Sequence, residues 1–165
     1  MKQSLKWAAA AIAAASNNAS FAFWVGHADD AALASPIFGV KIPAGYRDWK
    51  LIAVGEEIGL DELRDVVGNE AAVKAYQDGK TPFPDGTVLV KLAWKRKPVD
   101  GLSGAFVTGP ATTVQVMVKD SAKYAATGGW GFGRFIDGKP VDAAQHETCF
   151  ACHEAHARDF DFVFT

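Results

Sequence analysis

The chain has 165 residues, 49% of them hydrophobic and 22% charged, and a formal net charge of −2 at pH 7. This length and composition are typical of one globular domain with a buried core. No run of lysine and arginine stands out, which argues against nucleic acid as a partner. No apolar stretch reaches the roughly 20 residues of a membrane-spanning helix, which argues against a membrane span after signal removal.

Residues 1–22 have the features of a secretory signal: a positive start, a short apolar run and small residues before a cleavage site. Lys2 and Lys6 provide the positive charge, and cleavage is predicted after Ala22 or as late as Ala34. The alternative is an N-terminal anchor that is not cleaved. A signal directs the mature protein out of the cytoplasm, so we expect it in a bacterial periplasm.

Residues 23–41 are predicted to be a loose lead-in, and residues 42–165 the folded domain, with strand-like segments separated by turns. The predicted strands are Tyr46 to Val54, Leu63 to Val67, Thr87 to Lys95, Thr112 to Lys119, Trp130 to Ile136 and Phe160 to Phe164. The predicted helices are Glu70 to Gln77, Asp120 to Ala126 and residues 141–156, and Pro98 to Pro110 is predicted to be a glycine-rich loop.

Two of these elements carry clear local signals. Asn69 is expected to cap the N-terminus of the Glu70 helix, and Gly79 lies where a glycine commonly follows a helix. The strand from Thr87 alternates, so that one face carries Leu89, Lys91, Ala93 and Lys95. Because short turns between strands favour antiparallel pairing, we expect an α+β fold: mainly antiparallel β-sheet with a few short helices, in a single domain.

The sequence Cys149-Phe150-Ala151-Cys152-His153 is the attachment motif of a c-type haem. The two thiols bond to the two vinyl groups on one edge of a porphyrin, and the adjoining histidine ligates the iron. Three other readings are less consistent with the chain. A redox dithiol has no need of the histidine, a zinc site would need further ligands, and a disulfide would close an unusually tight loop. The motif therefore predicts one haem c per chain, with Cys149 and Cys152 as thioether residues and His153 as the proximal axial ligand.

The sixth iron position decides the class of haem protein, because electron carriers usually fill it with methionine or a second histidine. Met117 lies on the strand face opposite the valines, which favours a surface position over a ligand role. His156 follows the motif on the same helix and cannot reach the opposite side of the haem. His146 and His27 remain alternatives. The sequence therefore favours five-coordinate iron with an open site that binds or transforms a small molecule.

With the haem motif in place, the chain resembles the cytochrome P-460 family, which includes the cytochrome c′-β proteins. The resemblance covers about Ile42 to Thr165, and the order and spacing of several short pieces carry it. These pieces are Tyr46 to Trp49, Pro84 to Lys91, Val118 to Ser121, Gly129 to Phe132, Cys149 to His153 and Asp161 to Thr165.

The resemblance implies a largely antiparallel sheet, usually a homodimer. In the family's enzymes a lysine is cross-linked to the porphyrin, and the haem oxidises hydroxylamine to nitrogen oxides. Lys91 matches that lysine, and Lys95 is a weaker candidate on the same face. The alternative for Lys91 is a strand lysine without the cross-link, as in the c′-β type.

Two further positions follow from the resemblance. Arg64 matches a distal arginine of the enzymes, where a cation can donate hydrogen bonds to a bound ligand; the alternative is a surface arginine. The family position that carries a proton-accepting carboxylate is Ala144 here, although Asp142 and Glu147 are near. This departure predicts slow turnover, because a positioned base typically contributes about 10²–10⁴-fold in rate.

Three functions follow in order of preference. The first is an enzyme that oxidises hydroxylamine and passes the electrons to an external acceptor such as a cytochrome. The second is a non-catalytic nitric oxide-binding protein, acting as scavenger, carrier or sensor. The third is plain electron transfer, which the lack of a convincing axial methionine disfavours.

Overall fold

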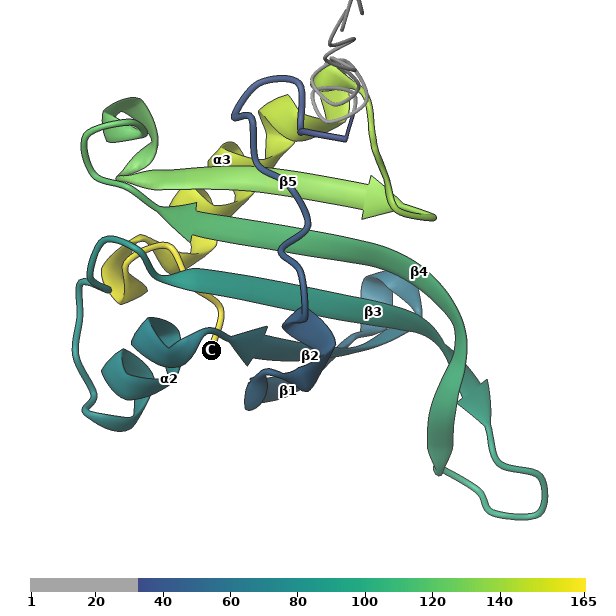
Figure 1. Cartoon of the computed structure of the whole chain (residues 1–165). Coiled ribbons are helices and arrows are strands. Elements are labelled where there is room, and N and C mark those ends of the chain that lie inside the picture. Colours follow the sequence, from purple (N-terminus) through teal and green to yellow (C-terminus); the bar gives the residue numbers. More distant parts are fainter. Residues whose placement is uncertain (1–32) are drawn as a thin grey trace, which may run out of the picture.

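The computed structural model describes residues 33–165, and its centre is an antiparallel sheet in which each strand pairs with the next along the chain (Figure 1). The six strands of this part of the chain are β1 (Lys50–Glu57), β2 (Glu62–Gly68), β3 (Val88–Pro98), β4 (Phe106–Lys119), β5 (Trp130–Ile136) and β6 (Lys139–Pro140). The α-helices are α2 (Glu70–Gln77) and α3 (Ala143–Ala157), and the 3₁₀ turns are η1 (Tyr46–Asp48), η2 (Ile58–Leu60), η3 (Ala125–Thr127) and η4 (Arg158–Phe160). The expected α+β fold in one domain is confirmed.

The register of the central strands separates the two faces of the sheet. Leu89 lies opposite Met117 and Lys91 opposite Gln115, while Val90 lies opposite Val116 between them. Because side chains alternate along a strand, the first four share one face and the valines share the other. The predicted alternation of β3 is therefore confirmed.

Each face of the sheet has its own hydrophobic core. The first joins the sheet to α2 and to the C-terminal residues, and its buried members are Ile52, Val66, Ala72, Val73, Ala75, Phe83, Leu89, Trp130, Phe132 and Val163. The second contains Val40, Val67, Val90, Leu92, Val116, Tyr124 and Phe135. In Figure 1 the lead-in crosses one face of the sheet, in front of β5, β4 and β3, and α3 crosses behind β5 and β4.

The helix α2 begins and ends as predicted. The Asn69 side chain accepts hydrogen bonds from the backbone N–H groups of Ala72 (3.0 Å) and Val88 (3.1 Å), so one residue caps the helix and ties it to β3. Gly79 adopts φ +61° just beyond the helix, a conformation that glycine enters at little cost.

The predicted loop from Pro98 to Pro110 is wrong at both ends. The strand β3 runs to Pro98 and β4 begins at Phe106, and their outer parts form a paired arm that projects from the sheet; only the turn between Pro98 and Phe106 lacks strand structure (Figure 1). The Arg96 guanidinium lies 4.2 Å from the centre of the Phe106 ring, a cation–π contact across the arm. Such cross-strand contacts hold glycine-containing segments in strand geometry that composition alone does not predict.

Three other predictions from the sequence also differ from the structure. The first strand begins at Lys50, because η1 precedes it. The predicted helix from Asp120 to Ala126 consists of turns and η3, with the Asp120 carboxylate accepting from the Lys123 N–H. Residues 33–41 have neither helix nor strand, yet they pack firmly: the Ser35 hydroxyl donates to the Phe132 carbonyl (2.9 Å) and Val40 is 3% exposed.

The predicted strand from Phe160 to Phe164 is also wrong. Phe160 ends η4, and Asp161 and Phe162 have φ values of 52° and 66°, which lie in the left-handed region and are incompatible with a strand. We call residues 161–165 the C-terminal strap.

The predicted signal, the cleavage after Ala22 and most of the lead-in lie outside the described residues. Within residues 33–165, no helix is long and apolar enough to cross a membrane.

Candidate haem-binding site

A cavity of about 210 Å³ is lined by α3, the strap and one face of the sheet. The helix contributes Thr148, Cys149, Cys152 and His153. The strands contribute Arg64, Val66, Leu89, Lys91, Gln115, Val116, Met117, Phe132, Gly133 and Arg134, and the strap contributes Val163, Phe164 and Thr165. Every residue of the attachment motif with a role in haem chemistry therefore faces one cavity.

The helical spacing of the motif explains this arrangement. Cys149, Cys152 and His153 are three and four residues apart, which places them on one face of α3. Both cysteines are unpaired thiols, with Cys149 partly buried and Cys152 exposed. Among the described residues no group of three histidine, cysteine, aspartate or glutamate side chains could hold a metal ion. The site thus offers two thiols that can attach a c-type haem and one imidazole that can ligate its iron.

The His153 ring is held in a defined orientation. Its Nδ1 lies 2.6 Å from the Phe162 carbonyl oxygen, and the ring contacts Phe132 and Phe164 at centroid distances of 5.1 and 4.8 Å. A carbonyl accepts only, so Nδ1 carries the proton and Nε2 is left to ligate. Burial is the main cause that lowers the pKa of His153; the hydrogen bond to the Phe162 carbonyl raises it in part, and the positive charges of Lys91 and Arg64 lower it further. The neutral imidazole that iron binds is therefore favoured.

The other candidate axial ligands are placed differently. His146 is fully buried, with Nε2 accepting from the Arg134 N–H (3.0 Å) and Nδ1 within 2.8 Å of the Asp142 carbonyl, so both ring nitrogens are committed. His156 is exposed and does not line the cavity. Met117 lines the cavity and packs against the first core, so its predicted surface position is wrong. His27 lies outside the described residues.

The lining fits a flat, apolar ligand that carries acidic groups. Leu89, Met117 and Phe132 provide apolar walls, and no aspartate or glutamate is among the lining residues that the structure describes. The buried Nε of Arg134 has no hydrogen-bond partner within residues 33–165, and the buried Nε of Arg64 has only an ion-pair contact there. Buried N–H groups are normally satisfied. A haem, with an apolar ring and two carboxylates, matches both features.

Comparison with known families supports the same cofactor. A family model described as cytochrome P-460 matches residues 43–165, well over half of the chain. The chain belongs to the cytochrome P-460 family. Membership implies a haem cofactor and its iron, and it confirms the resemblance seen in the sequence. No curated protein matches the chain.

Lys91 and Arg64 both face the cavity and share one carboxylate. The Lys91 Nζ lies 2.5 Å from Glu57 Oε1, and the Arg64 Nε lies 3.3 Å from the same oxygen. Arg64 also donates to the Phe164 carbonyl at 3.5 Å. Gly55 leaves room for Arg64, because a Cβ at Gly55 would lie 3.0 Å from the Arg64 Nε. Arg64 is therefore a cavity residue and not an ordinary surface arginine.

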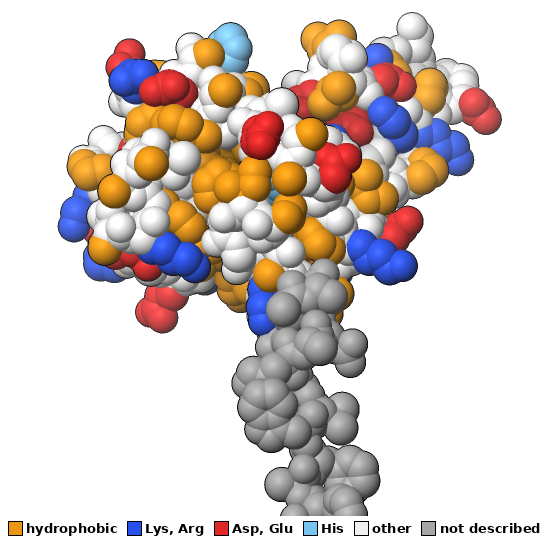
Figure 2. Space-filling view, turned by 90° about the horizontal axis from the view of Figure 1, so that it is seen from above, with side chains coloured by type: hydrophobic (Ala, Val, Ile, Leu, Met, Phe, Trp, Pro, Cys, Tyr) orange, Lys and Arg blue, Asp and Glu red, His pale blue; other side chains and the backbone are white. Residues whose placement is uncertain are grey.

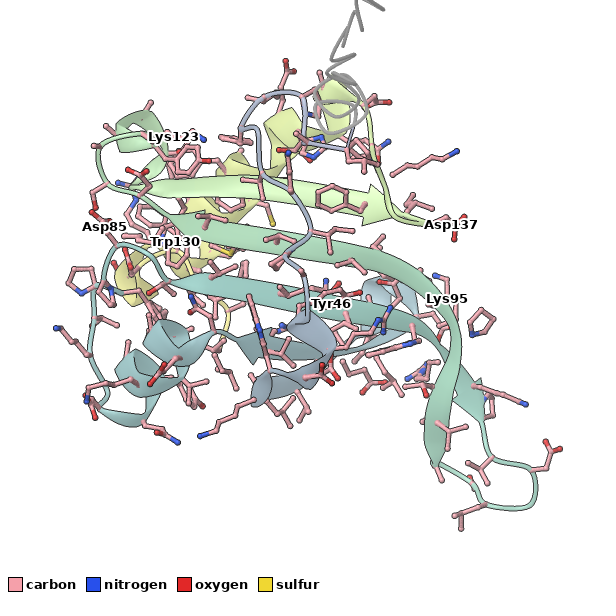
Figure 3. All side chains as sticks on the ribbon, in the orientation of Figure 1. Tyr46, Asp85, Lys95, Lys123, Trp130 and Asp137 are labelled. Carbon is pink, nitrogen blue, oxygen red and sulfur yellow. The ribbon has the colours of Figure 1, made fainter. Side chains whose placement is uncertain are left out.

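Lys95, the weaker candidate, is committed elsewhere. Its Nζ donates to the Leu60 carbonyl at 2.7 Å, and Lys95 is not among the residues that line the cavity. Figure 3 shows Lys95 towards the end of the sheet opposite Trp130. Of the two lysines predicted on this face, Lys91 alone is placed to meet a haem.

The carboxylates near the motif do not replace the missing base. Ala144 is exposed and does not line the cavity, Asp142 caps α3 by accepting from the Gln145 N–H (2.9 Å), and Glu147 is exposed. Glu57, the acid that touches Lys91 and Arg64, was missed in the sequence. Nothing local distinguishes Glu57 from Glu56; only the pairing of β1 with β2 brings it to Arg64.

Proposed function

We propose that this protein is an exported one-haem c-type cytochrome with five-coordinate iron that oxidises hydroxylamine to nitrogen oxides. The electrons pass to an external acceptor such as a cytochrome. The observation that carries the proposal is the cavity itself: Cys149, Cys152 and His153 line it together with Lys91 and Arg64. When bound, the haem iron supplies the site that takes up the substrate and removes its electrons.

The chain's own residues divide the remaining work. Cys149 and Cys152 would hold the haem through thioether bonds and His153 would ligate its iron through Nε2, while the Phe162 carbonyl holds the proton on Nδ1. Arg64, whose side chain is 18% exposed, donates hydrogen bonds to the oxygen of a bound ligand.

Lys91 is the residue placed for a covalent bond to the porphyrin. Such a bond replaces an N–H and a porphyrin C–H bond by a C–N bond and releases two protons and two electrons, so an external two-electron oxidant must take the electrons. The Lys91 nitrogen must lose a proton before it can act as a nucleophile, and the Glu57 carboxylate 2.5 Å away is placed to accept that proton. The side chain of Lys91 is 17% exposed, so bulk water competes weakly for this role.

A second function has an observation in its favour. The described lining residues include no carboxylate, and Ala144 occupies the family position of a proton acceptor. A haem protein without a positioned base binds nitric oxide readily but oxidises hydroxylamine slowly, because the missing base is worth about 10²–10⁴-fold. The alternative is therefore a nitric oxide-binding scavenger, carrier or sensor.

Steady-state turnover separates the two functions. We expect the purified protein to oxidise hydroxylamine with an artificial electron acceptor, and Arg64→Leu to reduce kcat/KM by about 10²-fold because one donor is removed. Tight nitric oxide binding without any hydroxylamine turnover would overturn the enzyme proposal and support the alternative.

We also propose a periplasmic location and a homodimer. The location rests on the signal-like residues 1–22. The homodimer is supported by exposed apolar side chains on the edge strand β1, on η2 and on the projecting arm, namely Leu51, Val54, Ile58, Leu60, Leu102 and Val107. Figure 2 shows hydrophobic side chains also gathered over the middle of the face seen from above, with charged side chains around them.

A further inference from the structure

The C-terminal strap brings a backbone carbonyl to the His153 ring through an unusual path. Asp161 and Phe162 both have positive φ values, 52° and 66°. Non-glycine residues rarely adopt this region, and for a bulky residue such as phenylalanine it is an outlier. Conformations of this kind persist only when surrounding contacts enforce them.

A buried ion pair supplies those contacts. The Lys119 Nζ lies 2.8 and 3.0 Å from the two carboxylate oxygens of Asp161, and the side chains are 5% and 8% exposed. The Asp161 carboxylate also accepts from the Phe83 N–H at 2.8 Å. Lys119 donates in addition to the Gly128 carbonyl (3.1 Å) and lies 4.9 Å from the centre of the Trp130 ring. Both residues of the pair therefore have a further backbone partner.

The Phe162 side chain is fixed as well. Its ring occupies the space beside Gly128, where a Cβ would lie 2.3 Å from the ring, and it packs against Phe150 at a centroid distance of 5.5 Å. The Phe162 N–H donates to the Ala157 carbonyl at 2.7 Å. With the preceding residue, the ring and the N–H all held, the direction of the Phe162 carbonyl is set.

We propose that Lys119 and Asp161 form a clamp that fixes the Phe162 carbonyl against His153 Nδ1 and thereby tunes the iron. They are positioning residues, since neither lines the cavity. An acceptor at Nδ1 orients the imidazole and raises its basicity as a ligand, which stabilises the ferric state and lowers the reduction potential. The inference rests on the proposed ligation by His153, and it holds for the enzyme and for the nitric oxide-binding alternative.

The test compares three variants of the haem-loaded protein by spectroelectrochemical titration and by the Fe–His stretch in resonance Raman of the ferrous state. Lys119→Met removes the clamp, Lys119→Arg keeps its charge, and Val90→Ala destabilises the second core on the opposite face, where Val90 is 0% exposed. We expect Lys119→Met to raise the ferrous-to-ferric ratio at fixed potential about tenfold, equivalent to about 59 mV for one electron. The Fe–His frequency falls in Lys119→Met and recovers in Lys119→Arg, and Val90→Ala shifts neither readout.

A second variant covers the case in which Lys119→Met does not fold. Gly128→Ala keeps both clamp charges but displaces the Phe162 ring, so it should move potential and frequency in the same direction. The clamp would be overturned if Lys119→Met lowered the thermal stability but left the potential and the Fe–His frequency unchanged. If Lys119→Met does not fold, the same result in Gly128→Ala would overturn it. Lys119 and Asp161 would then be a structural ion pair only. Absence of an Fe–His band in an unaltered protein whose ferrous iron is high-spin and five-coordinate would instead overturn the ligation by His153.

Discussion

The ion pair of Lys119 with Asp161 and the ion-pair group of Lys91, Glu57 and Arg64 differ in how firmly they are held. Lys119 and Asp161 are 5% and 8% exposed, and each has additional hydrogen bonds to backbone. Lys91, Glu57 and Arg64 are 17%, 30% and 18% exposed, and one carboxylate oxygen serves both cations.

The difference in exposure suits the two groups to different tasks: one fixes the orientation of an iron ligand, and the other leaves its side chains able to move. A buried pair with every atom satisfied keeps one arrangement, because breaking it strands a charge in a low-dielectric interior. A partly exposed pair costs little to rearrange. The buried pair suits the task of holding the carbonyl on His153, whereas the shared carboxylate leaves Lys91 and Arg64 able to turn towards a haem or its ligand.

The largest effect is expected for Lys91, which belongs to the partly exposed group. Lys91→Met should abolish any covalent bond between porphyrin and strand β3 while leaving both thioethers intact. Mass spectrometry of proteolytic haem peptides, together with the reduced pyridine spectrum, measures this. Lys95→Met is the matched control, because Lys95 lies on the same strand but outside the cavity. An ordinary c-type haem spectrum in the unaltered protein would eliminate the cross-link.

The next largest effect is expected for the buried pair of Lys119 and Asp161. Lys119→Met leaves Asp161 buried without its partner, so we expect the free energy of unfolding to fall by about 3–5 kcal/mol. Urea denaturation of the haem-loaded protein measures the loss. Lys74→Met removes the exposed pair with Asp78 on α2 and should leave unfolding unchanged. Equal losses of unfolding free energy in Lys119→Met and Lys74→Met would show that the buried pair is no more stabilising than an exposed one.

A smaller effect is expected for the shared carboxylate. Glu57→Gln removes the proton acceptor beside Lys91, and cross-linking should slow by roughly 10²-fold. Because the pair is partly exposed, the free energy of unfolding should change by no more than about 1 kcal/mol. A time course of the cross-linked fraction by intact mass measures the rate, with Glu56→Gln as the neighbouring control. An unaltered rate would assign the proton to another acceptor.

The smallest effect is expected at Met117. The residue lines the cavity, but we propose that it packs there and does not ligate, so Met117→Leu should leave the ferric absorption spectrum unchanged. Leucine preserves most of the volume, which keeps the wall of the cavity intact. Conversion from a low-spin to a high-spin spectrum on substitution would identify Met117 as the sixth ligand.

The sequence predicted the parts of the fold whose cause is local. The attachment motif, the Asn69 cap and the alternation of β3 each depend on residues within one helix or strand, and all three features are present in the structure. Lys91 was singled out by the family resemblance, and it lines the cavity on the strand face that the alternation assigned to it.

The remaining features depend on contacts between distant segments. The strap resembles a strand in composition, but the Lys119–Asp161 pair and the contact of Phe162 with Gly128 impose left-handed backbone there. Glu57 joins Arg64 and Lys91 only after three strands have paired. Met117 faces the cavity because the chain continues into α3, which covers that face of the sheet.

Low-temperature electron paramagnetic resonance of the ferric protein tests the central claim most directly, namely that His153 ligates the iron on one side and the other side is open. We expect a high-spin signal from five-coordinate iron that changes when a small ligand is added. A low-spin ferric signal from the protein alone would show a sixth side-chain ligand and would contradict the open site.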